Sequence, residues 1–187
     1  AAPRRCARRA PSRSSSTAGV RSGRPAWPSA CRLFLAAALV NAAGPPVVTV
    51  SRFKSSTPLP ERVATTDLFH IVARKAVVAG LSFYMFGADE AENAAAVANV
   101  REMYPDLKIV GHSHGYLRGV ALRTRVDEIN ALAPDYLWVA LGVPYEQAFV
   151  EEFTPRLSNV GIIKTSGGLF NFLSGSRARA PQWMQQL

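Results

Sequence analysis

A regular alternation of short apolar runs with longer amphipathic segments, from residue 67 to residue 168, most constrains what this chain can fold into. The apolar runs cover residues 81–86, 107–110, 136–141 and 160–164, and each ends in glycine or a glycine-containing loop. Buried strands that alternate with helices form βαβ units, whose strands lie parallel in one sheet. We therefore predict an α/β fold, a Rossmann-like parallel sheet of at least four strands with helices on both faces.

The segments between the runs carry helix start and stop signals. Asp67 and Asp89 are expected to cap helices that end at Gly80 and at residue 103. Two more helices are predicted over residues 118–132 and 145–157. Farther upstream, Pro45-Pro46 predicts a break that is followed by a short strand over residues 47–50.

The net charge of +9 comes almost entirely from the N-terminal tail. Residues 1–32 contain eight arginines and no acidic residue, whereas the rest of the chain has 14 basic and 13 acidic side chains. Proteins that bind duplexes usually spread Lys and Arg over a folded face, so we expect no specific nucleic acid, although an Arg-rich arm can bind phosphates nonspecifically. The composition predicts a disordered leader over 1–32 and one domain over 33–187.

The two cysteines and the apolar runs limit which metal sites, disulfides and membrane segments the chain can form. Cys6 and Cys31 have no partner at metal-ligand spacing, so we expect neither a disulfide framework nor a zinc site. The most apolar run, residues 33–40, is far shorter than the roughly 20 residues of a spanning helix. Basic residues ahead of it also resemble a signal peptide, but the long Pro/Ser-rich tail favours a disordered leader.

Ligands of parallel α/β sheets bind beyond the carboxyl ends of the strands, which places the candidate site in four loops. These cover residues 87–89, 111–116, 142–147 and 165–171. The 142–147 loop, with Gly142 and Pro144, leads into a helix N-terminus that favours phosphate oxygens. Thr165 and Gly168 offer further backbone amides and a hydroxyl. Glu146 and Gln147 either cap that helix or face a ligand. Arg62, in a loop ahead of the first helix, is either solvated or neutralises a diphosphate.

The densest polar cluster, residues 111–116, leaves several chemistries open. His112 and His114 are two potential metal ligands, but no Cys or third His completes a site except His70 in a helix. The string around Ser113 fits G-x-S-x-G, yet no His follows His114 as a hydrolase triad requires. Tyr116 offers a flat face to a base or sugar. The fingerprints G-x-G-x-x-G and G-x-x-x-x-G-K-[ST] are both missing.

Four runs of sequence resemble one family in its order and spacing. They are LPERVATTDLF (59–69), FGADEAENAAAVANVREMYPDLKIVGHSHGY (86–116), INALAPDYLWVALGVP (129–144) and GGLFNFLSGSRARAPQWMQ (167–185). The chain from about residue 41 to residue 186 is similar to the WecG/TagA/CpsF glycosyltransferases, glycosyltransferase family 26.

The resemblance implies an inverting glycosyltransferase of exopolysaccharide or cell-envelope synthesis. Such an enzyme moves an N-acetylmannosamine-type sugar or glucose from a UDP-sugar donor to a polyprenyl-diphosphate-linked acceptor, with no cofactor and no essential metal. It works in the bacterial cytoplasm, peripheral to the inner face of the membrane, and it tends to self-associate.

Site residues carry over from the family position by position. Arg62 matches an arginine expected near the donor diphosphate, and Tyr116 matches a tyrosine expected to stack on uracil. Asn171 stands where the family has an Asp that contacts the nucleoside. Glu146 and Gln147 invert the family's Gln-Glu pair, and the resemblance assigns them to catalysis with Arg62.

One departure bears on catalysis. Ala43 occupies the position of the family's Asp in a motif like NADG, the best candidate for the general base. A positioned base contributes roughly 10²–10⁴ in rate. The alternative to an enzyme is therefore a catalytically impaired nucleotide-sugar binder or a partner in a polysaccharide-assembly complex.

Overall fold

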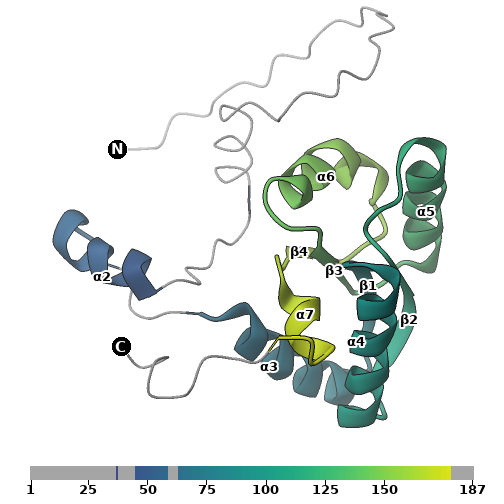
Figure 1. Cartoon of the computed structure of the whole chain (residues 1–187), viewed down its shortest axis with the longest axis horizontal. Coiled ribbons are helices and arrows are strands. Elements are labelled where there is room, and N and C mark those ends of the chain that lie inside the picture. The colour runs from purple at the N-terminus through teal and green to yellow at the C-terminus, as the bar shows by residue number, and fades with distance from the viewer. Residues whose placement is uncertain (1–36, 38–44, 59–62, 178–187) are drawn as a thin grey trace, which may run out of the picture.

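The computed structural model describes residue 37 and residues 45–58 and 63–177. At its centre is a four-stranded sheet in the order β2-β1-β3-β4, with every neighbouring pair parallel. The strands are β1 (Ser82–Gly87), β2 (Lys108–Ser113), β3 (Tyr136–Ala140) and β4 (Ile162–Thr165). Figure 1 shows helices on both sides of the sheet, which confirms the predicted α/β fold.

Each face of the sheet buries its own apolar cluster. One face is covered by α3 (Thr65–Ala79), α4 (Glu90–Met103) and α7 (Leu169–Leu173), and the other by α5 (Gly119–Leu132) and α6 (Tyr145–Phe153). Phe83 and Met85 of β1 belong to the first cluster, and Tyr84 and Phe86 belong to the second. Successive strand side chains point to opposite faces, so the unbroken apolar run of β1 serves both cores.

Local signals set two of the helix ends as predicted. Asp89 caps α4, because its Oδ1 accepts from the backbone N–H of Glu92 at 2.8 Å. Gly80 ends α3 in the left-handed region, at φ +69°. The predicted cap at Asp67 is wrong: the cap residue is Ala64, and Asp67 lies in the first turn, where a carboxylate still favours the helix dipole.

The predicted strand over residues 47–50 is wrong, because these residues belong to helix α2 (Pro45–Lys54). A proline in the first turn of a helix costs no hydrogen bond, because the backbone N–H groups of that turn have no partner within the helix. Pro45 and Pro46 therefore begin α2 instead of breaking it. Arg52 and Lys54 lie in its last turn, where positive charge is favourable.

The bounds of two other elements differ clearly from the prediction. β2 runs on through Gly111 to Ser113, so residues expected in a loop are paired with β1. α6 ends at Phe153 and is followed by the 3-10 turn η1 (Thr154–Arg156), because Pro155 has no N–H to continue an α-helix. The short helix α7 was not predicted.

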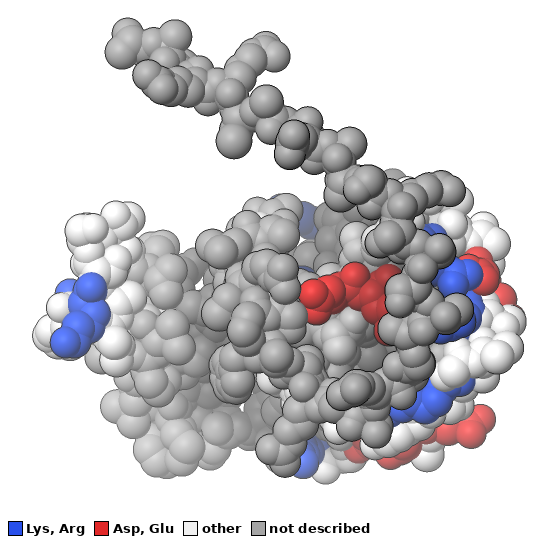
Figure 2. Space-filling view, turned by 90° about the horizontal axis from the view of Figure 1, so that it is seen from above, with Lys and Arg blue, Asp and Glu red and all other residues white. Residues whose placement is uncertain are grey.

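Charges of both signs are mixed on the surface. Figure 2 shows basic and acidic side chains of the described residues next to one another on one face. Within the described ranges, no helix combines the length and apolar character needed to cross a membrane.

Candidate functional site

The strand order creates a topological switch point at β1. From β1 the chain passes through α4 to β2 on one side, then returns through α5 to β3 on the other. Ligands of open α/β sheets bind in the crevice at such a point. The N–H of Ala88 donates to the Ala140 carbonyl at 2.9 Å, and the N–H of Gly115 donates to the Ala88 carbonyl at 2.8 Å. The ends of β1, β2 and β3 are thus tied together.

This close approach depends on two glycines. Gly87 has φ +141°, and a Cβ there would meet the backbone of Ala140, including its carbonyl oxygen. A Cβ at Gly115 would meet the Leu141 side chain and lie 3.1 Å from the Gly87 Cα. Side chains at either position would push the strand ends apart.

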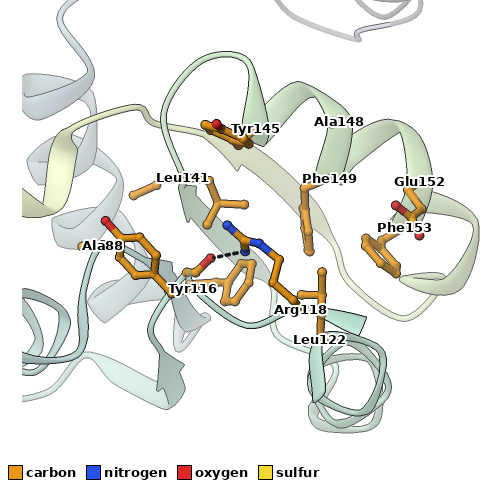
Figure 3. A pocket seen from close by; sticks show the side chains of 13 residues that line it. Ala88, Tyr116, Arg118, Leu122, Leu141, Tyr145, Ala148, Phe149, Glu152 and Phe153 are labelled. Atoms are coloured by element: carbon orange, nitrogen blue, oxygen red, sulfur yellow. Dashed lines mark hydrogen bonds between the residues drawn. The ribbon is translucent and has the colours of Figure 1, made fainter. Parts of the chain in front are cut away.

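A cavity of about 350 Å³ opens at the switch point, on the side of α5 and α6 (Figure 3). It is lined by Phe86, Ala88, Gly115, Tyr116, Arg118, Leu122, Ala140, Leu141, Tyr145, Ala148, Phe149, Glu152 and Phe153. Its deep wall is apolar, with Phe86 and Phe149 buried, whereas Tyr116 and Tyr145 are 69% and 63% exposed. Such a mixture of apolar wall and a few polar groups is typical of small-molecule sites.

Arg118 brings a positive charge into this cavity. Its Nη1 donates to the carbonyls of Gly115, at 3.1 Å, and Leu117, at 2.6 Å. The guanidinium is therefore held by its own loop, and Figure 3 shows it between Leu141 and Phe149. The sequence analysis did not single out Arg118; its place two residues after Tyr116 was the available signal.

A second polar cluster lies at the end of β4. Glu146, only 5% exposed, accepts from the Gly167 N–H through Oε2 at 2.9 Å. The residue before Gly167, Ser166, donates to the Val139 carbonyl through both its N–H and its hydroxyl, at 2.8 and 2.9 Å. Burial raises the pKa of Glu146, while the Gly167 N–H and the Lys164 charge oppose this rise.

Lys164 is the charged neighbour of this carboxylate. It is half-buried, and its Nζ donates to the Thr165 carbonyl at 2.7 Å. Burial lowers the pKa of Lys164, and the Glu146 charge counters this effect. Sequence analysis missed Lys164 because it reads as the end of an apolar strand. Gln147, beside Glu146, has a buried Oε1 with no hydrogen-bond partner in the described part of the chain.

Asn171 is engaged with helix α4. Its Nδ2 donates to both carboxylate oxygens of Glu92, at 2.7 and 2.8 Å, and the Ser176 hydroxyl donates to the same carboxylate. This side chain thus links α7 to α4. The position predicted for nucleoside contact carries a bridge between helices.

The histidine-rich run is ordered by Asn93, which is buried. Its Nδ2 donates to the carbonyls of Met85, Gly87 and Ser113, at 3.2, 2.9 and 3.0 Å. Its Oδ1 must then accept, so His112 donates to it from Nδ1 at 2.8 Å. Burial and the charges of Arg101 and Arg125 lower the pKa of His112.

The hydrolase and metal interpretations of this run find no geometric support. Ser113 is buried within β2, not exposed on a strand-to-helix elbow, and its hydroxyl faces the His114 carbonyl. Across the described ranges, no three His, Cys, Asp or Glu side chains lie close enough to hold a metal ion.

The predicted site residues fall into two groups at one edge of the sheet. Tyr116 lines the cavity, and Gly142 and Pro144 lie in the loop between Leu141 and Tyr145. The second group surrounds the turn after β4 and comprises Glu146, Gln147, Thr165 and Gly168, with Asn171 turned toward α4. Arg62 and Ala43 lie outside the described residues.

Comparison with known proteins relates the chain to one family of glycosyltransferases. The sequence model of the glycosyl transferase WecG/TagA/CpsF family matches residues 7–187. Curated relatives carry the name N-acetylglucosaminyldiphosphoundecaprenol N-acetyl-beta-D-mannosaminyltransferase. The protein of Bacillus subtilis (strain 168) is 31% identical over 144 residues, which is 75% of this chain and 54% of the relative. That of Bacillus spizizenii is 32% identical over 152 residues, and that of Staphylococcus aureus (strain MRSA252) is 25% identical over 151.

This chain thus spans just over half the length of these relatives. The family match nevertheless covers nearly all of its own residues. The chain belongs to the WecG/TagA/CpsF family of glycosyltransferases.

Proposed function

We propose that this protein transfers an N-acetylmannosamine-type sugar or glucose from a UDP donor to a polyprenyl-diphosphate-linked acceptor, with inversion and without a metal. The name of the relatives describes transfer of N-acetylmannosamine to a diphosphoundecaprenol-linked sugar, which supports this acceptor class. The chemistry takes place at the inner face of the bacterial membrane, in exopolysaccharide or envelope synthesis. The domain over residues 33–187 carries it, and copies self-associate.

The cavity at the switch point is the observation that carries the proposal. Tyr116 is exposed at its mouth and can stack on a base, because a phenol ring presents a large flat face at low entropic cost. From there, the loop with Gly142 and Pro144 and the turn with Thr165 and Gly168 extend along the same sheet edge toward the buried Glu146. We place the nucleoside at Tyr116 and the diphosphate-sugar along this edge.

The test is UDP binding by calorimetry on the whole chain, without added metal. Tyr116→Ala should weaken binding about tenfold or more, since stacking on an aromatic ring contributes on the order of 1–3 kcal/mol. Val78→Ala, a change at an exposed residue of α3, is the control and should leave binding unchanged. If the folded wild-type chain binds no UDP, the proposed function is wrong.

A second function, nucleotide-sugar binding without transfer, is favoured by one observation. Ala43 holds no group that can take a proton from an acceptor hydroxyl. Ala43→Asp discriminates the two functions in a transfer assay with a polyprenyl-diphosphate-linked acceptor. A gain of about 10²-fold or more indicates an enzyme impaired at this position, and binding of UDP with no gain indicates a binder.

A further inference from the structure

Arg118 lies in the cavity with part of its hydrogen-bonding capacity unused. A guanidinium has five N–H donors in a fixed fork. The two bonds from Nη1 to the Gly115 and Leu117 carbonyls hold the group in place. In the described part of the chain, Nε and Nη2 have no acceptor, and Arg118 forms no ion pair with Glu152 or any other carboxylate. A preorganised donor edge therefore faces the cavity.

The surroundings of this edge select the shape of its ligand. Leu141 and Phe149 flank the guanidinium (Figure 3), and Tyr116 stands at the mouth of the same cavity. The apolar faces beside the guanidinium favour a flat ring, and the donors of Arg118 favour a ring that carries an acceptor. The carboxylate of Glu152 lines the cavity from the far end of α6 and is exposed to solvent. The best match is a planar base with a carbonyl oxygen directed at Arg118.

We propose that Arg118 is a specificity-determining residue that selects uracil over cytosine in the donor nucleotide. This inference rests on the proposed function, since it concerns the base of the same donor. Uracil carries a carbonyl oxygen at position 4, which accepts hydrogen bonds, whereas cytosine carries an amino group there, which donates. Because a guanidinium only donates, a cytosine held with position 4 toward Arg118 would leave donors facing donors.

The experiment compares UDP and CDP binding by calorimetry on the whole chain. The wild type should bind UDP about ten- to a hundredfold more tightly than CDP, which corresponds to one discriminating base contact. Arg118→Met removes the donors at similar side-chain length and should abolish this ratio. Arg118→Lys keeps the charge but not the fork, and it should reduce the ratio while preserving the general attraction for diphosphates. Arg123→Met, an exposed change on α5 outside the cavity, should keep the ratio.

Each other outcome contradicts the inference in its own way. An Arg118→Met protein that keeps the preference for UDP, or a wild type that binds both nucleotides equally, overturns this inference and leaves the proposed function standing. An equal loss of UDP and CDP affinity in both variants, with loss of inorganic pyrophosphate binding, assigns Arg118 to the phosphates instead of the base. A folded wild type that binds neither nucleotide overturns the inference together with the proposed function. Thermal unfolding of every variant establishes that it is folded.

Discussion

The amide of Asn171 donates to both carboxylate oxygens of Glu92, at 2.7 and 2.8 Å, and so joins α7 to α4 across 79 residues of sequence. The backbone carbonyl of Asn171 accepts from the hydroxyls of Ser174 and Ser176, which closes the turn after α7. Position 171 therefore supports the edge of the sheet where the turn after β4 lies. An amide suits this position because it is a donor that faces a carboxylate.

Asn171→Asp should destabilise the protein at neutral pH. The new carboxylate would face Glu92 within hydrogen-bond distance, and like charges this close oppose each other's ionisation. We expect a loss of about 1–3 kcal/mol in the free energy of unfolding at pH 7, measured by urea denaturation. Repulsion raises the pKa of the pair in the folded state, so the loss should shrink as the pH falls to about 4.

The matched control for this variant is Glu92→Gln combined with Asn171→Asp. This pair exchanges donor and acceptor, so the double variant should recover most of the lost stability at pH 7. If the single variant is as stable as the wild type at every pH, the bridge between α7 and α4 contributes nothing.

His112 should remain neutral at pH 7 with its proton on Nδ1. Asn93 spends its two amide hydrogens on three backbone carbonyls, so only its oxygen is left for the ring. Nitrogen-detected NMR of the imidazole should show the Nδ1–H tautomer, and a pH titration should give a pKa below that of a free histidine. A charged ring at pH 7, or the other tautomer, would contradict the assignment of Asn93.

The same shift predicts a pH dependence of stability. Since the pKa of His112 is lower in the folded state, its neutral form supports the fold above the ordinary histidine pKa. That support is lost as the pH falls through this value, because the unfolded chain binds the proton more readily. His112→Gln should therefore flatten the change in unfolding free energy between about pH 7 and pH 5. An unchanged slope in the variant would show that His112 has no part in it.

Gly87→Ala should be far more damaging than an alanine at another glycine of positive φ. The new Cβ would meet the Ala140 backbone at the switch point, and φ is +141°. We expect a cost of roughly 3 kcal/mol or more, from backbone strain and overpacking together. Gly175→Ala is the control: φ is +80° there, but no atom lies within 4 Å of the new Cβ, so about 1 kcal/mol is expected. Equal costs in thermal unfolding would show that the contact with Ala140 is unimportant.

The fold was largely predictable because its signals are local. The strands β1 and β3 lie in apolar runs that are buried on both faces, and Asp89 and Gly80 mark helix ends through bonds to residues four or fewer positions away. The strand expected at 47–50 failed because β propensity is a weak preference that yields to context. α7 was missed because five residues are too few to show a helical period.

The candidate site was only partly predictable because its contacts join distant segments. Tyr116 was found as a strand-end aromatic residue, and it lines the cavity. The bridge between Asn171 and Glu92, and the approach of Lys164 to Glu146, link residues from different elements. No spacing in the sequence indicates such pairs. Arginine is a common residue in loops, so the sequence did not indicate a role for Arg118. Its position in the cavity is seen only in the structure.

Glu146→Gln should change how stability depends on pH. Burial raises the pKa of the wild-type carboxyl, so its ionisation costs the folded state some stability that the unfolded chain does not lose. This penalty is missing below the ordinary glutamate pKa and sets in as the pH rises through it. The glutamine variant has no such penalty and can still accept from the Gly167 N–H. The free energy of unfolding of the variant, compared with that of the wild type, should therefore be larger at pH 7 than at pH 4. Urea denaturation of both proteins at each pH measures this difference.

Lys164 must be controlled in this comparison, because removing the carboxylate also removes the charge that faces this half-buried ammonium. Lys164→Met combined with Glu146→Gln removes both charges, so no ammonium is left without its counter-charge. The double variant should show the same gain in stability over the wild type between pH 4 and pH 7. A wild type that gains stability over both variants as the pH rises from 4 to 7 would mean that the ionised Glu146 stabilises the turn after β4. In that case its bond from Gly167 and the charge of Lys164 would outweigh the cost of burial.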